Sequence, residues 1–464
     1  MRTVIKNGTL ALEEGTVQAD LLIEEEKIVA VGEVIEVRAD DAVIDAAGMY
    51  VMPGGVDSHT HFALRSGPYT TVDDFATGTR AAACGGITTI IDYATQLSGD
   101  SLLETIERRR AQADGQVHID YGLHAIVVDL EHGQADELPE LVEMGIPSVK
   151  VYTTYRDAKF YSDDLTILRL LEEGQDIGLL VTVHAENDAI VEGTKAMLTQ
   201  RGLTSPAYHG KSRPPMAETE AANRMVFLAQ SVGSPMYLVH LSTPEAVELT
   251  AEARRRGEPV IAESCPHYLV LDDSVFEGEH PEEFICSPPV RPAEKVARMQ
   301  EFLKAGEIQV VASDHCGYVR AQKRQATSFN DAAQGIPGVE TSLQVLYSRL
   351  VASGELPLER LAKVLSTNPA MVYGLYPQKG TLRPGSDADV VIYDPTGEHV
   401  LQDEDLHGAL GSYTPFAGHT IYGRVVTTIS RGKVIYHDGK FVGERAHGRF
   451  VTGKPFDPTI VSEL

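Results

Sequence analysis

The order of apolar and polar positions divides the chain into three stretches. Residues 1–52 form short apolar runs such as VIKNGTLAL, separated by Gly and Asp turns, and this pattern predicts short strands. Residues 53–376 repeat an apolar strand, a turn and an amphipathic helix, which is typical of βα units around a parallel sheet. Residues 377–464 return to short strands after the turn LRPGSDAD. We therefore predict one α/β domain between two β-rich ends.

Eight apolar segments of the central stretch predict the strands of a (β/α)₈ TIM barrel. The segments are MPGGVDSHTHF, GITTIIDY, DYGLHAIVV, PSVKVYT, LLVTVHAE, MYLVHLS, PVIAES and IQVVASDH. Amphipathic segments between them, such as TVDDFATGTRAAACGG, predict the outer helices. Because the β-rich ends flank the barrel, we expect residues 1–52 and 377–464 to join in one β-sandwich domain. The strands expected in the second end are ADVVIYDP, GRVVTTISRGKVIYHDGKFV and GRFVTG.

The composition is that of a folded protein with an acidic surface. Hydrophobic residues make up 43% of the 464 positions and charged residues 23%, which argues against disordered and fibrous classes. The formal net charge of -27 would repel phosphate backbones and anionic lipids. Neither nucleic acid nor a membrane is therefore an expected partner.

The start of the chain and its cysteines favour a cytoplasmic location. The segment MRTVIKNGTL lacks the apolar core of a signal peptide, and no apolar run approaches about 18 residues. Cys84, Cys265, Cys286 and Cys316 are widely spaced without a CxxC pair, which favours a reducing compartment over a disulfide scaffold.

Metal-binding side chains recur at the ends of the predicted barrel strands, where barrel enzymes place their reacting groups. His59 and His61 are two positions apart, so on a strand they share one face and can bind one ion. An HxH pair alone is weak evidence in a chain with 16 histidines. The other polar side chains at strand ends are His184, His240 and Asp314. Together these five predict a site for zinc or a similar divalent ion.

Lys150 lies among apolar neighbours in PSVKVYTTY, where a free ammonium group is costly to bury. Two explanations remain open from the residues alone. Lys150 could form an ordinary salt bridge, or its amine could be deprotonated and modified into a metal ligand.

The motifs together resemble the dihydropyrimidinase, hydantoinase and allantoinase branch of the amidohydrolase superfamily. The resemblance covers nearly the whole chain and rests on PGGVDSHTHF, DDFATGTRAAACGGITTIIDY, SVKVYTTY, VTVHAEND, YLVHLS, ESCPHYL, CSPPVR, ASDHC and QKGTLRPGSDADVVIYDP. It implies a (β/α)₈ barrel with a β-sandwich, and hydrolysis of the cyclic amide bond of hydantoins or dihydropyrimidines to N-carbamoyl amino acids. Relatives are commonly homotetramers.

The resemblance also assigns the metal ligands. It implies two zinc ions bridged by a carboxylated Lys150 and a hydroxide. Asp314 would serve as the proton shuttle. The more buried ion would be held by His59, His61 and Asp314, and the outer one by His184 and His240.

Substrate contacts follow from the same resemblance. Tyr155 matches the tyrosine that hydrogen-bonds the substrate carbonyl or its oxyanion. Ser287 matches a residue whose backbone meets the substrate imide, and Gln334 stands where hydantoinases usually have asparagine. The residues expected to surround the ring substituent are Leu64, Tyr152 and Phe160. The loop YRDAKFYSDD is one residue longer than usual, so Lys159 is an alternative to Phe160.

The superfamily offers three alternative functions. Allantoinase is the main alternative, because ESCPHYL, CSPPVR and the tail GHTIYGRVVTTISRGKVIY are closer to that enzyme. Dihydroorotase is disfavoured, because Ala63 stands where those enzymes carry an arginine. A non-catalytic scaffold of the collapsin response mediator type lacks metal ligands, whereas all six ligand positions are filled here. Cys316, His124 and His267 are expected to be packing residues.

Overall fold

Eight parallel strands form the centre of the molecule in the computed structural model, which describes residues 2–130 and 133–464. Their hydrogen-bonding order follows the chain from β6 to β15, and a parallel bridge between Thr60 and His315 brings the first and last strands together. The predicted barrel is therefore confirmed as a nearly closed one. The strands are β6 (Gly55–Thr60), β9 (Ile87–Thr95), β10 (Asp120–Ile126), β11 (Ser148–Tyr152), β12 (Leu180–His184), β13 (Met236–Leu238), β14 (Val260–Ser264) and β15 (Val310–Val311).

The barrel strands are buried on both faces, because helices cover the outside and side chains fill the interior. In β9, ITTIIDYAT, every residue except the last is buried. The predicted helix at TVDDFATGTRAAACGG begins only at Phe75, because the side chain of Asp74 caps it by accepting from the backbone of Thr77. The longer outer helices are α1 (Phe75–Cys84), α2 (Leu102–Ala113), α4 (Asp164–Ile177), α5 (Asp188–Gln200), α7 (Pro215–Val232), α8 (Pro244–Arg255) and α10 (Ala293–Ala305).

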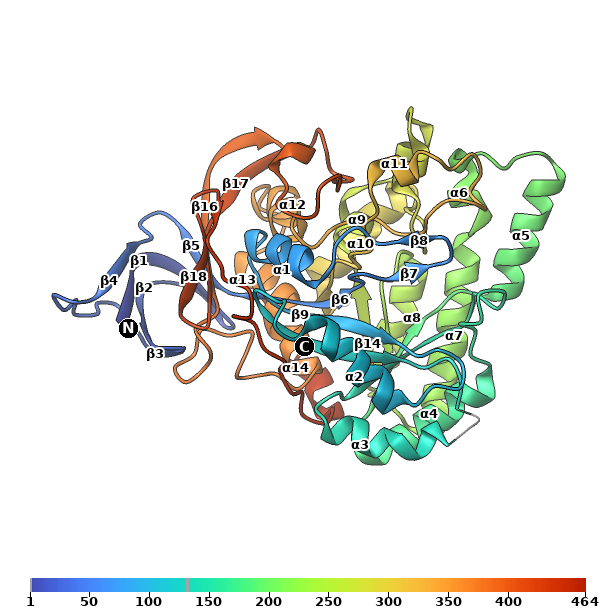
Figure 1. Cartoon of the computed structure of the whole chain (residues 1–464), viewed down its shortest axis with the longest axis horizontal. Coiled ribbons are helices and arrows are strands. Elements are labelled where there is room, and N and C mark those ends of the chain that lie inside the picture. Colours follow the sequence, from blue (N-terminus) through green and yellow to red (C-terminus); the bar gives the residue numbers. More distant parts are fainter. Residues whose placement is uncertain (1, 131–132) are drawn as a thin grey trace.

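The two ends of the chain form one sheet beside the barrel, as predicted. In Figure 1 the blue strands β1 to β5 and the red strands β16 to β18 lie together at one side of the molecule. Strand β5 pairs antiparallel with β16, so that Val51 lies opposite Ile392. Leu21 and Val390, from the two halves, pack in one buried cluster, so the folded sheet encloses its own core. Its strands are β1 (Arg2–Leu12), β2 (Gly15–Glu24), β3 (Lys27–Gly32), β4 (Ala42–Asp45), β5 (Tyr50–Pro53), β16 (Val390–Val400), β17 (Thr420–Ser430), β18 (Lys433–His437) and β19 (Lys440–Phe441).

The prediction of a strand at GRFVTG is wrong. Phe450 makes only an isolated bridge with Tyr121 at the start of β10. Val451 and Phe456 pack with Tyr373 under the barrel, in an apolar cluster separate from the core of the sheet. The chain therefore returns from the sheet to the barrel near its end, and the domain boundaries at residues 53 and 377 remain a proposal.

A buried group of ions connects the barrel to the sheet. The ammonium group of Lys379 donates to Asp120 at 2.6 Å and to Asp389 at 2.7 Å. It also lies 3.0 Å from Asp387, and all four side chains are buried. Because Asp120 begins the barrel strand β10 and Asp389 precedes β16, Lys379 holds the two parts together.

The cysteines and the longest helices were the subject of two further expectations. All four cysteines are buried, and none forms a disulfide. Among the described residues, no helix has both the length and the apolar character that crossing a membrane requires.

Candidate active site

The six predicted metal ligands meet at the carboxyl ends of the barrel strands. His59, Lys150 and His184 belong to β6, β11 and β12. His61, His240 and Asp314 follow shortly after β6, β13 and β15. The lysine and the four histidines are buried, and the side chain of Asp314 is 15% exposed. The strand-end rule therefore identified side chains that lie together.

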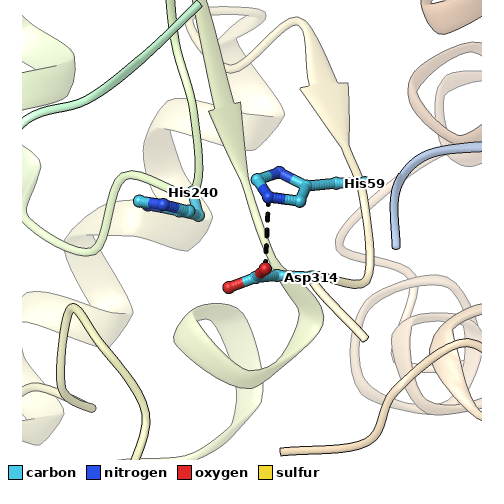
Figure 2. Close-up of side chains that lie close together, drawn as sticks. All are labelled: His59, His240 and Asp314. Carbon is cyan, nitrogen blue, oxygen red and sulfur yellow. Dashed lines mark ion pairs between the residues drawn. The ribbon is translucent and has the colours of Figure 1, made fainter. Parts of the chain in front are cut away.

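One half of this cluster is centred on Asp314. Its Oδ1 lies 3.2 Å from Nε2 of His59 and 3.4 Å from Nε2 of His61. Figure 2 shows His59 and His240 on two sides of the Asp314 carboxylate, with the His59 contact dashed. The ligand atoms of His59, His240 and Asp314 lie within 4.8 Å of one another.

The other half pairs His184 with His240. Nδ1 of His184 lies 3.0 Å from Nε2 of His240. Lys150 lies close to the first half, because its Nζ is 2.8 Å from Nε2 of His59. The ammonium group also lies over the ring of Tyr93, 4.3 Å from its centre. Two groups of ligands and one lysine thus share a single buried volume.

Three residues of the site have strained backbones. Tyr155, His240 and Asp314 have φ values of 66°, 40° and 47°, a left-handed conformation that residues other than glycine rarely adopt. Such strain persists only where the surrounding structure enforces it, and it is concentrated at functional sites. It turns the side chains of His240 and Asp314 toward the other ligands directly after their strands.

Two buried carboxylates that the sequence interpretation missed orient the histidines. Oε1 of Glu263 lies 2.7 Å from Nδ1 of His59, and Oε2 accepts from the hydroxyl of Tyr237 at 2.7 Å. Oε2 of Glu186 lies 2.8 Å from Nε2 of His184 and is paired with the guanidinium of Arg213. A carboxylate on one ring nitrogen fixes the tautomer and leaves the other nitrogen free to bind an ion.

Burial sets the charges of the ligands. It holds the pKa of His59 and of His240 well below the usual histidine value, and neighbouring charges such as Lys150 add to this effect. Burial also lowers the pKa of Lys150 to about 8. For Asp314 burial acts in the opposite direction, but the surrounding histidines outweigh it and hold the pKa well below the usual range. At neutral pH the six candidate ligands are therefore neutral imidazoles, the Asp314 carboxylate and a Lys150 amine that is mostly protonated.

These residues fit a metal centre. Nδ1 of His61 and Nδ1 of His240 are buried without a hydrogen-bond partner, although buried polar atoms normally have one. Imidazole nitrogen and carboxylate oxygen are the ligands that zinc and similar ions prefer. Four converging imidazoles with one carboxylate would otherwise be an expensive arrangement to bury.

Aromatic side chains from the end of β11 and the segment after it lie beside the histidines. The ring of Tyr155 lies 5.2 Å from that of His184, and the guanidinium of Arg213 lies 5.1 Å from the Tyr155 ring. Burial raises the pKa of Tyr155 to about 12, so its phenol is protonated at neutral pH. The rings of Tyr152 and Phe160 lie 5.5 Å apart, whereas the neighbouring Lys159 is exposed.

The remaining predicted substrate contacts lie on two other loops. The hydroxyl of Ser287 donates to Oε1 of Gln334 at 2.7 Å, which brings these two together. Leu64 packs against the small cluster of Cys316, Tyr318 and Ala333. The loops of Ser287 and Gln334 share one buried cation, which sequence interpretation missed. Nζ of Lys323 donates to the carbonyl oxygens of Ile285, Ala333 and Gly335.

The three residues expected to be packing residues have no place among the ligands. Cys316 is buried, and burial raises the pKa of its thiol to about 12, so it is a poor nucleophile. His124 is hydrogen-bonded to Ser148 at 2.6 Å and to the carbonyl of Ser58 at 3.0 Å. His267 packs on the ring of Tyr268, with 4.1 Å between their centres.

Comparisons with known proteins agree with this site. The model of the amidohydrolase family matches residues 50–435. The chain is 42% identical to the D-phenylhydantoinase of Escherichia coli over 465 residues, which cover 99% of this chain and 100% of that protein. The crystal structure of dihydropyrimidinase from Brevibacillus agri has a TM-score of 0.95 at 38% identity, over 98% of this chain and 100% of that one.

The likeness extends to an enzyme whose name gives the opposite stereochemical preference, L instead of D. The L-hydantoinase of Arthrobacter aurescens has a TM-score of 0.89 at 31% identity, over 97% of this chain and 99% of that one. Because the family model covers most of the chain and the curated relatives cover nearly all of it, this protein belongs to the amidohydrolase family, in the branch of the hydantoinases and dihydropyrimidinases.

Proposed function

We propose that the protein hydrolyses the cyclic amide bond of hydantoins or dihydropyrimidines and releases N-carbamoyl amino acids. The observation that carries this proposal is the position of Lys150, 2.8 Å from His59 in a buried cluster with three further imidazoles and Asp314. A lysine in this position is suited to a metal site that needs a further ligand. The D-phenylhydantoinase and dihydropyrimidinase relatives support the choice of substrate class.

The proposed cofactor is a pair of divalent metal ions, most simply zinc. His59, His61 and Asp314 would hold one ion, and His184 with His240 the other. Lys150 would bridge them as a carbamate, in which its neutral amine adds to carbon dioxide and loses one proton. When bound, two such ions would lower the pKa of water and polarise the substrate carbonyl.

Asp314 is the proposed proton carrier. Its carboxylate is ionised at neutral pH, and its side chain is the most exposed of the six ligand positions. It would accept a proton as water oxygen bonds to the ring carbonyl carbon. The same proton would pass to the ring nitrogen as the carbon–nitrogen bond breaks. One water is consumed, and the ring opens to a carboxylate and a ureido group.

The remaining polar groups are proposed to hold the ring. The protonated phenol of Tyr155 would donate to the carbonyl oxygen as negative charge develops on it. Ser287 and Gln334 would meet the imide of the substrate. Leu64, Tyr152 and Phe160 would contact the substituent of the ring.

A substrate panel tests this proposal. The enzyme, supplied with zinc and bicarbonate, would be assayed with dihydrouracil, hydantoin, 5-phenylhydantoin and allantoin. Turnover of the first three, with ureido acids as products, is the expected result. Turnover of allantoin alone would make the protein an allantoinase, and fewer than one metal ion per chain would favour a scaffold. Assembly as a homotetramer in the cytoplasm stays a prediction.

A further inference from the structure

A cavity of about 260 Å³ opens beside the candidate active site, between the segments that follow β6 and β9. His61 and Tyr93 line it, and their rings stack 4.8 Å apart within the site described above. A substrate group that enters the cavity would therefore lie next to the place where the ring would react.

The charged lining of this cavity is entirely basic. Arg65, Arg108 and Arg109 line it, and no Asp or Glu does so among the described residues. The chain as a whole carries a formal charge of -27. A cavity lined by three arginines and no acidic residue therefore differs in charge from the rest of the protein. A low-dielectric cavity with charges of one sign concentrates ligands of the opposite sign.

The three arginines differ in how far their charge is already neutralised. Arg109 is buried and bound to Asp92, with its Nε at 2.9 Å. Arg108 is half exposed and lies 3.0 Å from Asp100. Arg65 is exposed on the short strand β7 (Arg65–Ser66), and no salt bridge within the described part of the chain involves it. Arg65 is therefore the cation most available to a ligand, with Arg108 second.

We infer that this cavity receives a carboxylate carried by the ring substituent of the substrate. Arginine binds a carboxylate through two parallel hydrogen bonds, and this fit is better than that of a lysine. Leu64 and Leu97 also line the cavity and would cover a short apolar stem. The preferred substrates would then be 5-substituted hydantoins or dihydropyrimidines whose side chain ends in an acid. This inference rests on the proposed function and narrows it: of the three residues proposed to contact the substituent only Leu64 lines the cavity, so the acidic end would lie on the Leu64 side.

A matched pair of substrates tests the inference. One is 5-(2-carboxyethyl)hydantoin, and the other is its neutral amide, 5-(2-carbamoylethyl)hydantoin, which has nearly the same shape. We expect the wild-type kcat/KM for the acid to exceed that for the amide by about tenfold, the scale of one well-formed ion pair. Because screening weakens exposed pairs, this ratio should fall as sodium chloride is raised from 20 to 500 mM.

Variants locate the effect. Arg65→Ala should lower the acid-to-amide ratio about fivefold, mainly through KM for the acid, and Arg65→Lys should restore part of it. Arg108→Ala should have a smaller effect of the same sign. Arg445→Ala, which removes an exposed arginine of the C-terminal segment, is the matched control and should leave the ratio unchanged.

The outcomes separate this inference from the proposed function. If the amide and other neutral hydantoins are hydrolysed but the acid is not preferred, the inference is overturned and the proposed function stands. The inference is also overturned, and the proposed function still stands, if Arg65→Ala and Arg445→Ala change the acid-to-amide ratio equally. If no hydantoin is hydrolysed by the zinc-loaded enzyme, the proposed function fails and the inference fails with it.

Discussion

Glu263 and His59 face each other in the wall of the site, with Oε1 of the carboxylate 2.7 Å from Nδ1 of the imidazole. The opposite nitrogen, Nε2, lies 2.8 Å from Lys150 and 3.2 Å from Asp314. Burial raises the pKa of Glu263 to about 8, and in its ionised form this carboxyl keeps the proton of His59 on the nitrogen that faces away from the other candidate ligands. In that form Nε2 of His59 faces the cluster without a proton, as binding an ion requires.

Replacing Glu263 with Gln should weaken metal binding by roughly 10- to 100-fold, the usual cost of losing such a carboxylate. Competition with a zinc chelator measures this affinity directly. Tyr237→Phe is a matched control, because it removes only the hydroxyl that donates to the same carboxylate, and its effect should be smaller. Equal affinity in Glu263→Gln and the wild type would show that the carboxylate does not orient His59.

Tyr155→Phe should lower kcat by about 100-fold or more while KM changes little, because a donor to developing negative charge matters most in the transition state. Phenylalanine meets the same backbone strain at φ 66°, so melting temperature and metal content should match the wild type. Steady-state kinetics with 5-phenylhydantoin measures the change. A kcat within twofold of the wild type would exclude Tyr155 from the reaction.

Lys323→Met should raise KM and destabilise the fold. The ammonium group joins the loops of Ser287 and Gln334 through three backbone carbonyls, and its loss leaves buried acceptors without a donor. We expect the free energy of unfolding to fall by about 2 kcal/mol in urea titrations. Lys304→Met, on an exposed pair with Glu355, should change it by less than about 0.5 kcal/mol. An unchanged KM in Lys323→Met would show that these loops do not depend on the cation.

Lys379→Met should weaken the contact between the barrel and the sheet and so lower the free energy of unfolding. It removes the one cation that, among the described salt bridges, contacts Asp120, Asp387 and Asp389 together, and we expect a loss of about 3–5 kcal/mol at neutral pH. Lys440→Met, at an exposed position, is the control. Unfolding curves that coincide for the two variants would contradict this role.

The same network predicts that the free energy of unfolding depends on pH in the acid range. Burial raises the pKa of Asp387, but Lys379 and hydrogen bonds from Lys27 and Gln378 outweigh it and lower the pKa to about 2. A carboxyl whose folded pKa is depressed contributes stability that is present above its unfolded pKa, about 4, and is lost as pH falls through the folded value. The difference in unfolding free energy between the wild type and Lys379→Met should therefore narrow from pH 4 to pH 2.

Most of the fold was predictable because its strands are apolar runs with clear boundaries. Even β13 and β15, which are short, lie within the runs MYLVHLS and IQVVASDH. GRFVTG failed because Val451 is buried in the cluster with Tyr373, and Phe450 makes only an isolated bridge to Tyr121 instead of pairing in a sheet. Apolar character predicts burial, but it does not say against which surface.

The cluster of six candidate ligands was predictable for a different reason, since each of them lies in or just after an apolar strand whose carboxyl end faces the same rim. Glu263 is the last residue but one of PVIAES and satisfies the same rule, so a stricter search of strand ends would have found it. The pairing of Glu186 with Arg213 depends instead on how segments 27 positions apart pack, and no local pattern marks it. The cavity beside His61 likewise exists only once α2 lies against two loops.

The metal content of the wild type and of Lys150→Ala is the most direct test of the central claim. After purification in zinc and bicarbonate, we expect about two ions per chain in the wild type, and at most one in the variant with no activity and an unchanged circular dichroism spectrum. Two ions and full activity in Lys150→Ala would contradict a bridging lysine and, with it, the proposed two-metal mechanism.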